Sequence, residues 1–156
     1  MAVSSGVYAL TLEAQFKKTV GGDMESTNVS VLMVTDTHAP DFPADQFRNP
    51  AIDNEVTAGS GYTSGGKALA ATPSWTIGAP AAADRICYDS ADPAWATSTI
   101  TNAEAAVLFY STGTDTTDDL FLMSDFGAPV STANGTLTIT VDTPANGGWY
   151  YVDFQP

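Results

Sequence analysis

Basic residues are scarce in this sequence, and cysteine and histidine occur once each. Of 156 residues, five are lysine or arginine and 18 are aspartate or glutamate, which gives a formal net charge of −13 at pH 7. A chain with this balance repels the phosphates of DNA and RNA and the headgroups of an anionic membrane. We therefore expect no nucleic acid and no membrane as partners, whereas a protein partner is compatible with the charge.

The single cysteine, Cys87, excludes a disulfide within the chain. With only one histidine beside it, too few side chains remain for a zinc site of the Cys/His type. Lone cysteines are commonly buried as small apolar residues, and we interpret Cys87 in that way. No cofactor is predicted.

Long apolar runs are also absent. No window approaches the roughly 18 apolar residues of a membrane-spanning helix. Residues 1–6 show no basic segment followed by an apolar one, which is the pattern of a secretory signal. We therefore expect synthesis in the cytoplasm.

Short runs of β-forming residues, separated by turn signals, occupy most of the chain. They fall at residues 29–34, 68–77, 85–88, 96–100, 105–110, 120–123, 136–141 and 149–154. Their close, even spacing predicts a mostly-β fold, an antiparallel sandwich or barrel of about eight strands, in a single domain over residues 1–156. Turns are expected at 127–129 and 133–135, where glycine lies beside proline or asparagine. Trp75, Trp95 and Trp149 are interpreted as core or rim residues of the sandwich.

The N-terminal part predicts an extended arm, a helix, a central strand and a loop. Residues 1–9 are expected to form the arm. Leu12, Phe16 and Val20 recur at a spacing of four, which predicts a short amphipathic helix with these side chains on its buried face. The apolar run at 29–34 follows as a central strand. Residues 35–60 then form a long, proline-marked loop, of the kind that contacts a neighbouring protein in an assembly.

Residues that often carry chemistry are present but do not form a known catalytic pattern. His38 is interpreted as a solvated loop residue, and no triad partners surround it in a recognisable motif. The aspartates cluster at predicted turns, at positions 84, 89 and 92 and at positions 115, 118 and 119. Aspartate favours turns because it hydrogen-bonds to its own backbone, so solvated turn acids are expected. Glycoside hydrolysis and a calcium site remain the alternatives for these clusters. The prediction is that the chain is not an enzyme and has no catalytic or metal-ligating residue.

The most distinctive stretch runs from Asn54 to Leu69 and contains four glycines around one tyrosine. Its glycines are Gly59, Gly61, Gly65 and Gly66, and the tyrosine is Tyr62. Glycines allow a sharp turn, which fixes the aromatic ring before the chain enters a strand. The stretch lacks the Gly-Lys-Ser/Thr ending of a phosphate-binding loop, so we interpret it as a structural turn framework.

Taken in order from about Leu12 to Val141, these features resemble a family of small tailed-bacteriophage virion structural proteins. After the Phe-Lys helix, the stretches that carry the resemblance are Val-Ser-Val-Leu-Met-Val at 29–34, the glycine-tyrosine stretch at 54–69, Asp-Pro-Ala-Trp at 92–95, Ala-Ala-Val-Leu-Phe-Tyr at 105–110, Asp-Leu-Phe-Leu-Met-Ser-Asp-Phe-Gly at 119–127 and Gly-Thr-Leu-Thr-Ile-Thr-Val-Asp at 135–142. The aromatic C-terminal residues 149–154 and the stretch 73–84 depart from the family pattern.

The resemblance implies a virion component, and the leading hypothesis is a capsid decoration or cement protein on the capsid surface. Its partner would be the major capsid protein, and it would assemble as a trimer or dimer. The expected contact residues are Met1, Ala2 and Val3 in the arm, Pro40, Phe42 and Phe47 in the loop, and Tyr150 and Tyr151 near the C-terminus. Alternatives are a phage tail or head-fibre component, or a carbohydrate-binding module that stacks tryptophan or tyrosine on sugar rings.

Overall fold

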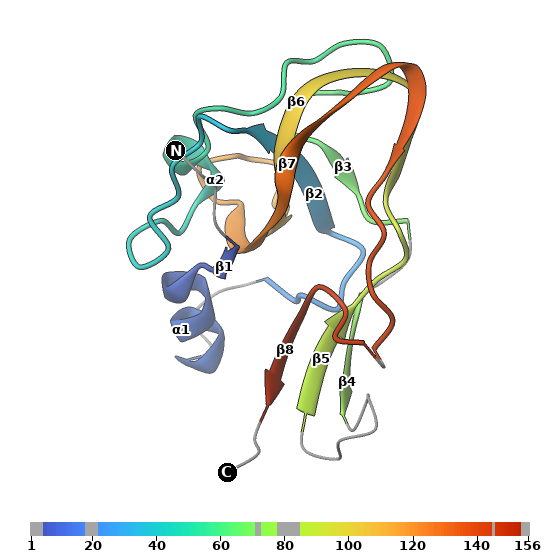
Figure 1. The fold of residues 1–156 in the computed structure, drawn as a ribbon. Coiled ribbons are helices and arrows are strands. Elements are labelled where there is room, and N and C mark those ends of the chain that lie inside the picture. Colours follow the sequence, from blue (N-terminus) through green and yellow to red (C-terminus); the bar gives the residue numbers. More distant parts are fainter. Residues whose placement is uncertain (1–4, 18–21, 71–72, 78–84, 145, 154–156) are drawn as a thin grey trace.

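The computed structural model describes residues 5–17, 22–70, 73–77, 85–144 and 146–153 (Figure 1). Its elements are β1 (Gly6–Val7), α1 (Ala9–Lys17), β2 (Val29–Thr35), α2 (Arg48–Ala51), β3 (Lys67–Ala68), β4 (Ser74–Ile77), β5 (Arg85–Asp89), β6 (Ala94–Tyr110), β7 (Asp119–Thr138) and β8 (Tyr150–Asp153). The strands form a five-stranded sheet in the order β1-β7-β6-β2-β3 and a three-stranded sheet in the order β4-β5-β8. Every pairing between them is antiparallel, which confirms the mostly-β prediction.

Strands β6 and β7 form one long, bent hairpin that dominates the larger sheet (Figure 1). Each replaces two shorter strands that the sequence predicted, and the turns expected at 127–129 and 133–135 were wrong. The physical reason is that these residues form irregularities within a continuous ladder, whose register shifts at five places. Asn134 and Gly127 take positive φ angles of 52° and 76° there. Residues that tolerate such angles absorb an extra residue in a bulge without ending the strand.

The strand predicted at residues 68–77 was also wrong, because it is divided between the two sheets. β3 pairs with β2 in the larger sheet, and β4 pairs with β5 in the smaller one. Pro73 directly precedes β4. Proline has no backbone N–H to donate to a ladder, so a single strand does not continue through this position.

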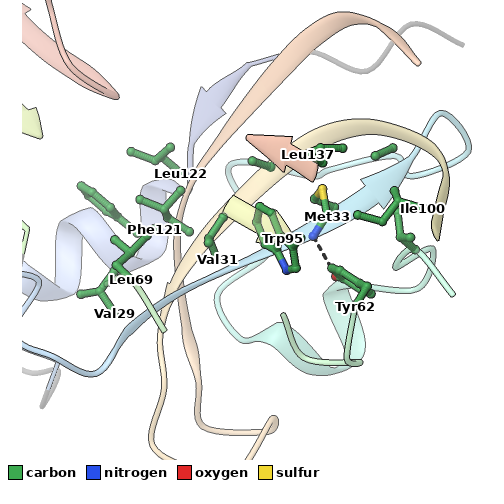
Figure 2. Close-up of a cluster of buried hydrophobic side chains, with 14 of the residues drawn as sticks. Val29, Val31, Met33, Tyr62, Leu69, Trp95, Ile100, Phe121, Leu122 and Leu137 are labelled. Carbon is green, nitrogen blue, oxygen red and sulfur yellow. Dashed lines mark hydrogen bonds between the residues drawn. The ribbon is translucent and has the colours of Figure 1, made fainter. Parts of the chain in front are cut away.

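Strand β2 is buried on both faces, as expected for a central strand with an unbroken apolar sequence. Val29, Val31 and Met33 point into the larger core cluster, whereas Leu32 and Val34 belong to a second cluster on the opposite face. Figure 2 shows the larger cluster, which gathers side chains from β2, β6 and β7, with Tyr62 at one end beside Met33 and Ile100. This cluster also contains Tyr88 of β5, so the two sheets share one core.

Residues 6–9 are part of the fold, which corrects for these residues the prediction of an extended arm over residues 1–9. Gly6 and Val7 form β1 and pair with Leu122 and Met123 of β7. Tyr8, which follows, is fully buried. The reason is that this short strand covers the outer edge of β7, which leaves an aromatic side chain in the core. Residues 1–4 lie outside the described part of the chain.

Helix α1 is present as predicted, but its buried face is not the predicted one. Thr11 is buried, Leu12 is half-buried and the Phe16 side chain is 80% exposed. Val20 lies outside the described residues. Leu12 and Phe16 do lie on one helix face, but that face borders an open groove and is not buried in the core.

Candidate functional site

The glycine-tyrosine stretch lies along the open edge of β2. β3 pairs with β2 only at Ser30 and Val31. Beyond that point Val56 N–H donates to the Met33 carbonyl (2.9 Å), and Met33 N–H donates to the Tyr62 hydroxyl oxygen (3.0 Å; Figure 2). We call residues 54–69 the edge segment, because they complete the hydrogen bonding of β2 where no neighbouring strand does.

Tyr62 is held at both ends of its side chain. Its ring is only 2% exposed and lies 6.1 Å from the ring of Trp95 between centroids. Its hydroxyl donates to Glu55 Oε1 (2.9 Å), an atom that also accepts a hydrogen bond from Gly65 N–H (2.7 Å). Burial raises the pKa of Tyr62 well above its ordinary value, so the hydroxyl keeps its proton.

Two glycines of the edge segment leave no room for a side chain. Gly61 has a φ of +74° and Gly66 a φ of +68°, both in the left-handed region that favours glycine. A Cβ on Gly66 would lie 2.0 Å from the Val31 carbonyl oxygen. Gly59 closes the tight turn through paired backbone hydrogen bonds with Tyr62. The segment therefore builds the fold and presents no reactive group of its own.

The aspartates at 118 and 119 are buried, which corrects their interpretation as solvated turn acids. Asp118 is fully buried and accepts hydrogen bonds from Arg48 Nε (3.0 Å) and from the backbone and hydroxyl of Thr112 (2.7 and 3.0 Å). The Arg48 guanidinium also lies 5.3 Å above the ring of Phe109. The burial is possible because a paired and hydrogen-bonded charge avoids most of the penalty for leaving water. This pair attaches the long loop to the start of β7.

Asp119 lines a cleft of about 890 Å³ together with Gln46, Phe47, Tyr110 and Thr112. Its side chain accepts a hydrogen bond from Gln46 Nε2 (3.2 Å). Burial, with a smaller contribution from the negative charge of Asp118, raises the pKa of Asp119 above its ordinary value. Hydroxyl, amide and carboxyl groups thus face the cleft, and they suit hydrogen bonding to a polar surface better than nucleophilic chemistry.

His38 is buried, which corrects its interpretation as a solvated loop residue. It is 3% exposed, and its Nδ1 lies 3.3 Å from Asp53 Oδ1, while Nε2 has no partner within the described residues. The hydrogen bond to His38 lowers the pKa of Asp53. The pair connects the segment just after β2 to the far part of the same loop.

The remaining aspartate clusters do not gather around a common point. Asp115 Oδ2 accepts a hydrogen bond from Asn49 Nδ2 (3.1 Å), and Asp92 Oδ1 accepts one from Val141 N–H (2.9 Å). Burial raises the pKa of Asp89. Asp84 lies outside the described residues. Within the described ranges, no group of three or more histidine, cysteine, aspartate or glutamate side chains is placed to hold a metal ion.

The predicted contact residues of the long loop have different environments. Phe42 is half-buried and packs on Tyr8, with ring centroids 5.2 Å apart. Pro40 is half-buried. Phe47 is 36% exposed at the rim of the cleft that Asp119 lines. Of these three residues, Phe47 presents the most accessible aromatic surface to a partner.

The predicted contact residues at the two ends of the chain are only partly described. Tyr150 is half-buried and Tyr151 is 46% exposed, both on β8. Met1, Ala2 and Val3 lie outside the described residues. Cys87, on the neighbouring strand β5, is fully buried, which confirms its interpretation as a small core residue.

The sequence did not reveal an apolar groove between α1 and the three-stranded sheet. Its volume is about 620 Å³, and Phe16 and Trp75 are among its lining residues. The helical spacing of Leu12 and Phe16 was the available signal, but spacing alone does not distinguish a buried face from a face on a groove. No helix in the described part of the chain is both long and apolar enough to cross a membrane.

Comparisons of the chain with protein-family models, with curated proteins and with solved structures gave no match. The likeness to phage virion proteins therefore remains a prediction from the sequence. A capsid location, the major capsid protein as partner and an oligomeric state are accordingly proposals.

Proposed function

We propose that this chain is a structural protein of tailed-phage virions that binds the major capsid protein shell as a decoration, or cement, protein. The observation that carries the proposal is the ordered set of motifs from about Leu12 to Val141. These motifs supply α1, β2, β6, β7 and the edge segment, which together form the framework of the fold. A likeness concentrated in framework residues supports a shared architecture with a structural role.

The arrangement of the buried ionisable groups supports binding rather than catalysis. Asp118 and His38 hydrogen-bond to side chains of the long loop, namely Arg48 and Asp53. The Arg48–Asp118 pair attaches this loop to the start of β7, and the His38–Asp53 pair joins two parts of the loop to each other. The loop then presents Phe47 beside a polar cleft, an aromatic side chain with hydrogen-bonding neighbours. Aromatic side chains are enriched in protein interfaces, so this surface suits a neighbouring protein.

The proposed mechanism is stabilisation by mass action. A protein that binds only the expanded shell lowers the free energy of that state, and this stabilisation rises with the logarithm of the free protein concentration once that concentration exceeds Kd. Assembly as a trimer or dimer would add avidity, because each oligomer would then bind the shell through several weak contacts at once. The excess of acidic side chains would face solvent, where like charges discourage particles from associating.

The test is reconstitution on particles that lack the protein. Phage would be grown with the gene for this chain deleted, and purified chain would be added back to the particles. We expect saturable binding to heads, and heads that withstand a higher temperature before releasing DNA. Absence of the chain from wild-type virions would refute the proposal, and binding to tails alone would replace the capsid location with a tail component.

The carbohydrate-binding alternative receives little support from the tryptophans. Trp95 is buried, and Trp149 is half-buried with its Nε1 donating to Ser90 Oγ (2.8 Å). Trp75 packs against Tyr88, with the two ring planes tilted by 53°. Sugar stacking needs a flat, open aromatic face, which these packed rings do not provide together.

A further inference from the structure

The groove between α1 and the three-stranded sheet is apolar over most of its lining. Eight of its eleven lining side chains are aliphatic or aromatic. Leu12 and Phe16 contribute from the helix, Trp75, Tyr150 and Val152 from strands β4 and β8, and Phe121 from β7. In Figure 1, α1 stands apart at one side of the molecule, and β8 is the strand of the smaller sheet nearest to it.

The helix side of the groove exposes a large aromatic ring. Leu12 and Phe16 are four residues apart and therefore share one helix face. Phe16 is nevertheless 80% exposed, the highest value among the large apolar side chains of the described residues. A ring left in water at the edge of an apolar groove lacks the stabilisation that burial of its apolar surface would give. Phe16 is thus placed to contact a bound segment as an aromatic anchor residue of the groove.

The polar lining residues are negative or neutral. They are Gln15, Asp23 and Glu25, and none of the eleven lining residues is basic. Backbone N–H groups fix both carboxylates, since Glu25 N–H donates to Asp23 Oδ1 (2.9 Å) and Trp75 N–H donates to Glu25 Oε1 (2.9 Å). Two positioned carboxylates at an apolar groove favour an occupant that carries positive charge next to its apolar residues.

We propose that this groove binds an apolar segment of a partner protein that has a lysine or arginine beside its apolar side chains. A second copy of this chain fits less well, because each copy has a net charge of −13 and would bring acidic side chains against Asp23 and Glu25. The same carboxylates disfavour an anionic lipid or detergent. The proposal concerns the chemistry of the groove and does not depend on a role in a virion.

The test uses two synthetic peptides with the same apolar centre and opposite charges. Acetyl-Lys-Phe-Leu-Val-Leu-Lys-amide is compared with acetyl-Glu-Phe-Leu-Val-Leu-Glu-amide, and binding to the full chain is followed by NMR through the Trp75 indole N–H. We expect saturable shifts with the lysine peptide and about tenfold weaker binding of the glutamate peptide, a difference that added salt reduces.

Three variants locate the binding. Phe16→Ser removes an exposed ring and should abolish binding while the protein stays folded. Asp23→Asn keeps the oxygen that accepts from Glu25 N–H but removes the charge, so it should reduce the preference for lysine. Val130→Ser changes a residue that is 41% exposed and does not line the groove, and should bind like the parent.

Other outcomes overturn the proposal in different ways. Absence of Trp75 shifts with either peptide means that the groove binds no such segment. Equal binding of both peptides removes the charge preference. If the parent sediments as a dimer that Phe16→Ser dissociates and Val130→Ser does not, the occupant is a second copy of the chain. None of these results bears on particle reconstitution, so the proposed function is tested separately.

Discussion

Tyr62 provides the sharpest test of how the edge segment stabilises the protein. Removing its hydroxyl in Tyr62→Phe leaves the buried Met33 N–H without its acceptor. A buried donor without a partner costs about 1–3 kcal/mol. Removing the ring as well, in Tyr62→Ala, adds a cavity term that brings the cost to about 3–5 kcal/mol or more. A protein of this size has a total stability of about 5–15 kcal/mol, so the alanine variant should lose a large share of its free energy of unfolding.

The assay is urea unfolding followed by tryptophan fluorescence, since Trp95 lies next to Tyr62. At an unchanged m-value, Tyr62→Phe should lower the free energy of unfolding by about 2 kcal/mol and Tm by about 4–8 °C. Tyr150→Phe, at a half-buried tyrosine of β8 for which no hydrogen bond of the hydroxyl is found among the described residues, is the matched control and should change stability by less than about 0.5 kcal/mol. The reasoning fails if Tyr62→Ala unfolds at the same urea concentration as the parent. It also fails if the phenylalanine variant and the control behave alike.

Three further predictions concern the buried charges and the N-terminus. Arg48→Met should cost about 3–5 kcal/mol in urea unfolding, because it leaves the carboxylate of Asp118 buried and unpaired, whereas Lys17→Met at an exposed ion pair should cost less than about 0.5 kcal/mol. Asp119→Asn should raise Tm at pH 7. Because the folded pKa of Asp119 lies above its unfolded value, its contribution to stability is lost as pH rises through the folded pKa, so the gain should vanish in acid below the unfolded value. Deletion of residues 1–9 should abolish cooperative melting in calorimetry, since it removes β1 and a fully buried tyrosine; a variant that melts like the parent would restore the picture of a separate arm.

The sequence predicted best where one local signal was sufficient. The run at 29–34 contains only β-branched, aliphatic and small residues, and it forms a strand buried on both faces. It predicted less well where a signal had two structural outcomes. Glycine and asparagine at 127 and 134 signal a turn, but the same tolerance of positive φ also permits a bulge in a long strand. Whether such a residue forms a turn or a bulge depends on how β6 pairs with β7. The register of that pairing cannot be read from the local sequence.

The environments of the charged residues depended on contacts distant in sequence. Asp118 and Arg48 are 70 residues apart, and the aspartate is buried because the two meet. His38 is buried, and its ring nitrogen meets Asp53, which is 15 residues further along the same loop. Such pairs have no local pattern, so a turn aspartate and a loop histidine were the reasonable expectations. The groove was missed for the same reason, because its lining residues come from segments far apart in the sequence, from Leu12 to Val152.

The edge segment should limit aggregation of this protein at high concentration. Unpaired strand edges are templates on which other chains add as extra strands, and this is a common start of aggregation. In this protein the apolar strand β2 would offer such a template over Met33 to Thr35, but Tyr62, Val56 and Asn54 occupy its hydrogen-bonding groups. The protection comes from a side-chain hydroxyl and a glycine-rich loop, neither of which can itself recruit a further strand in register. A chain protected in this way can remain soluble at high local concentration, and loss of Tyr62 should appear first as precipitation in concentrated samples.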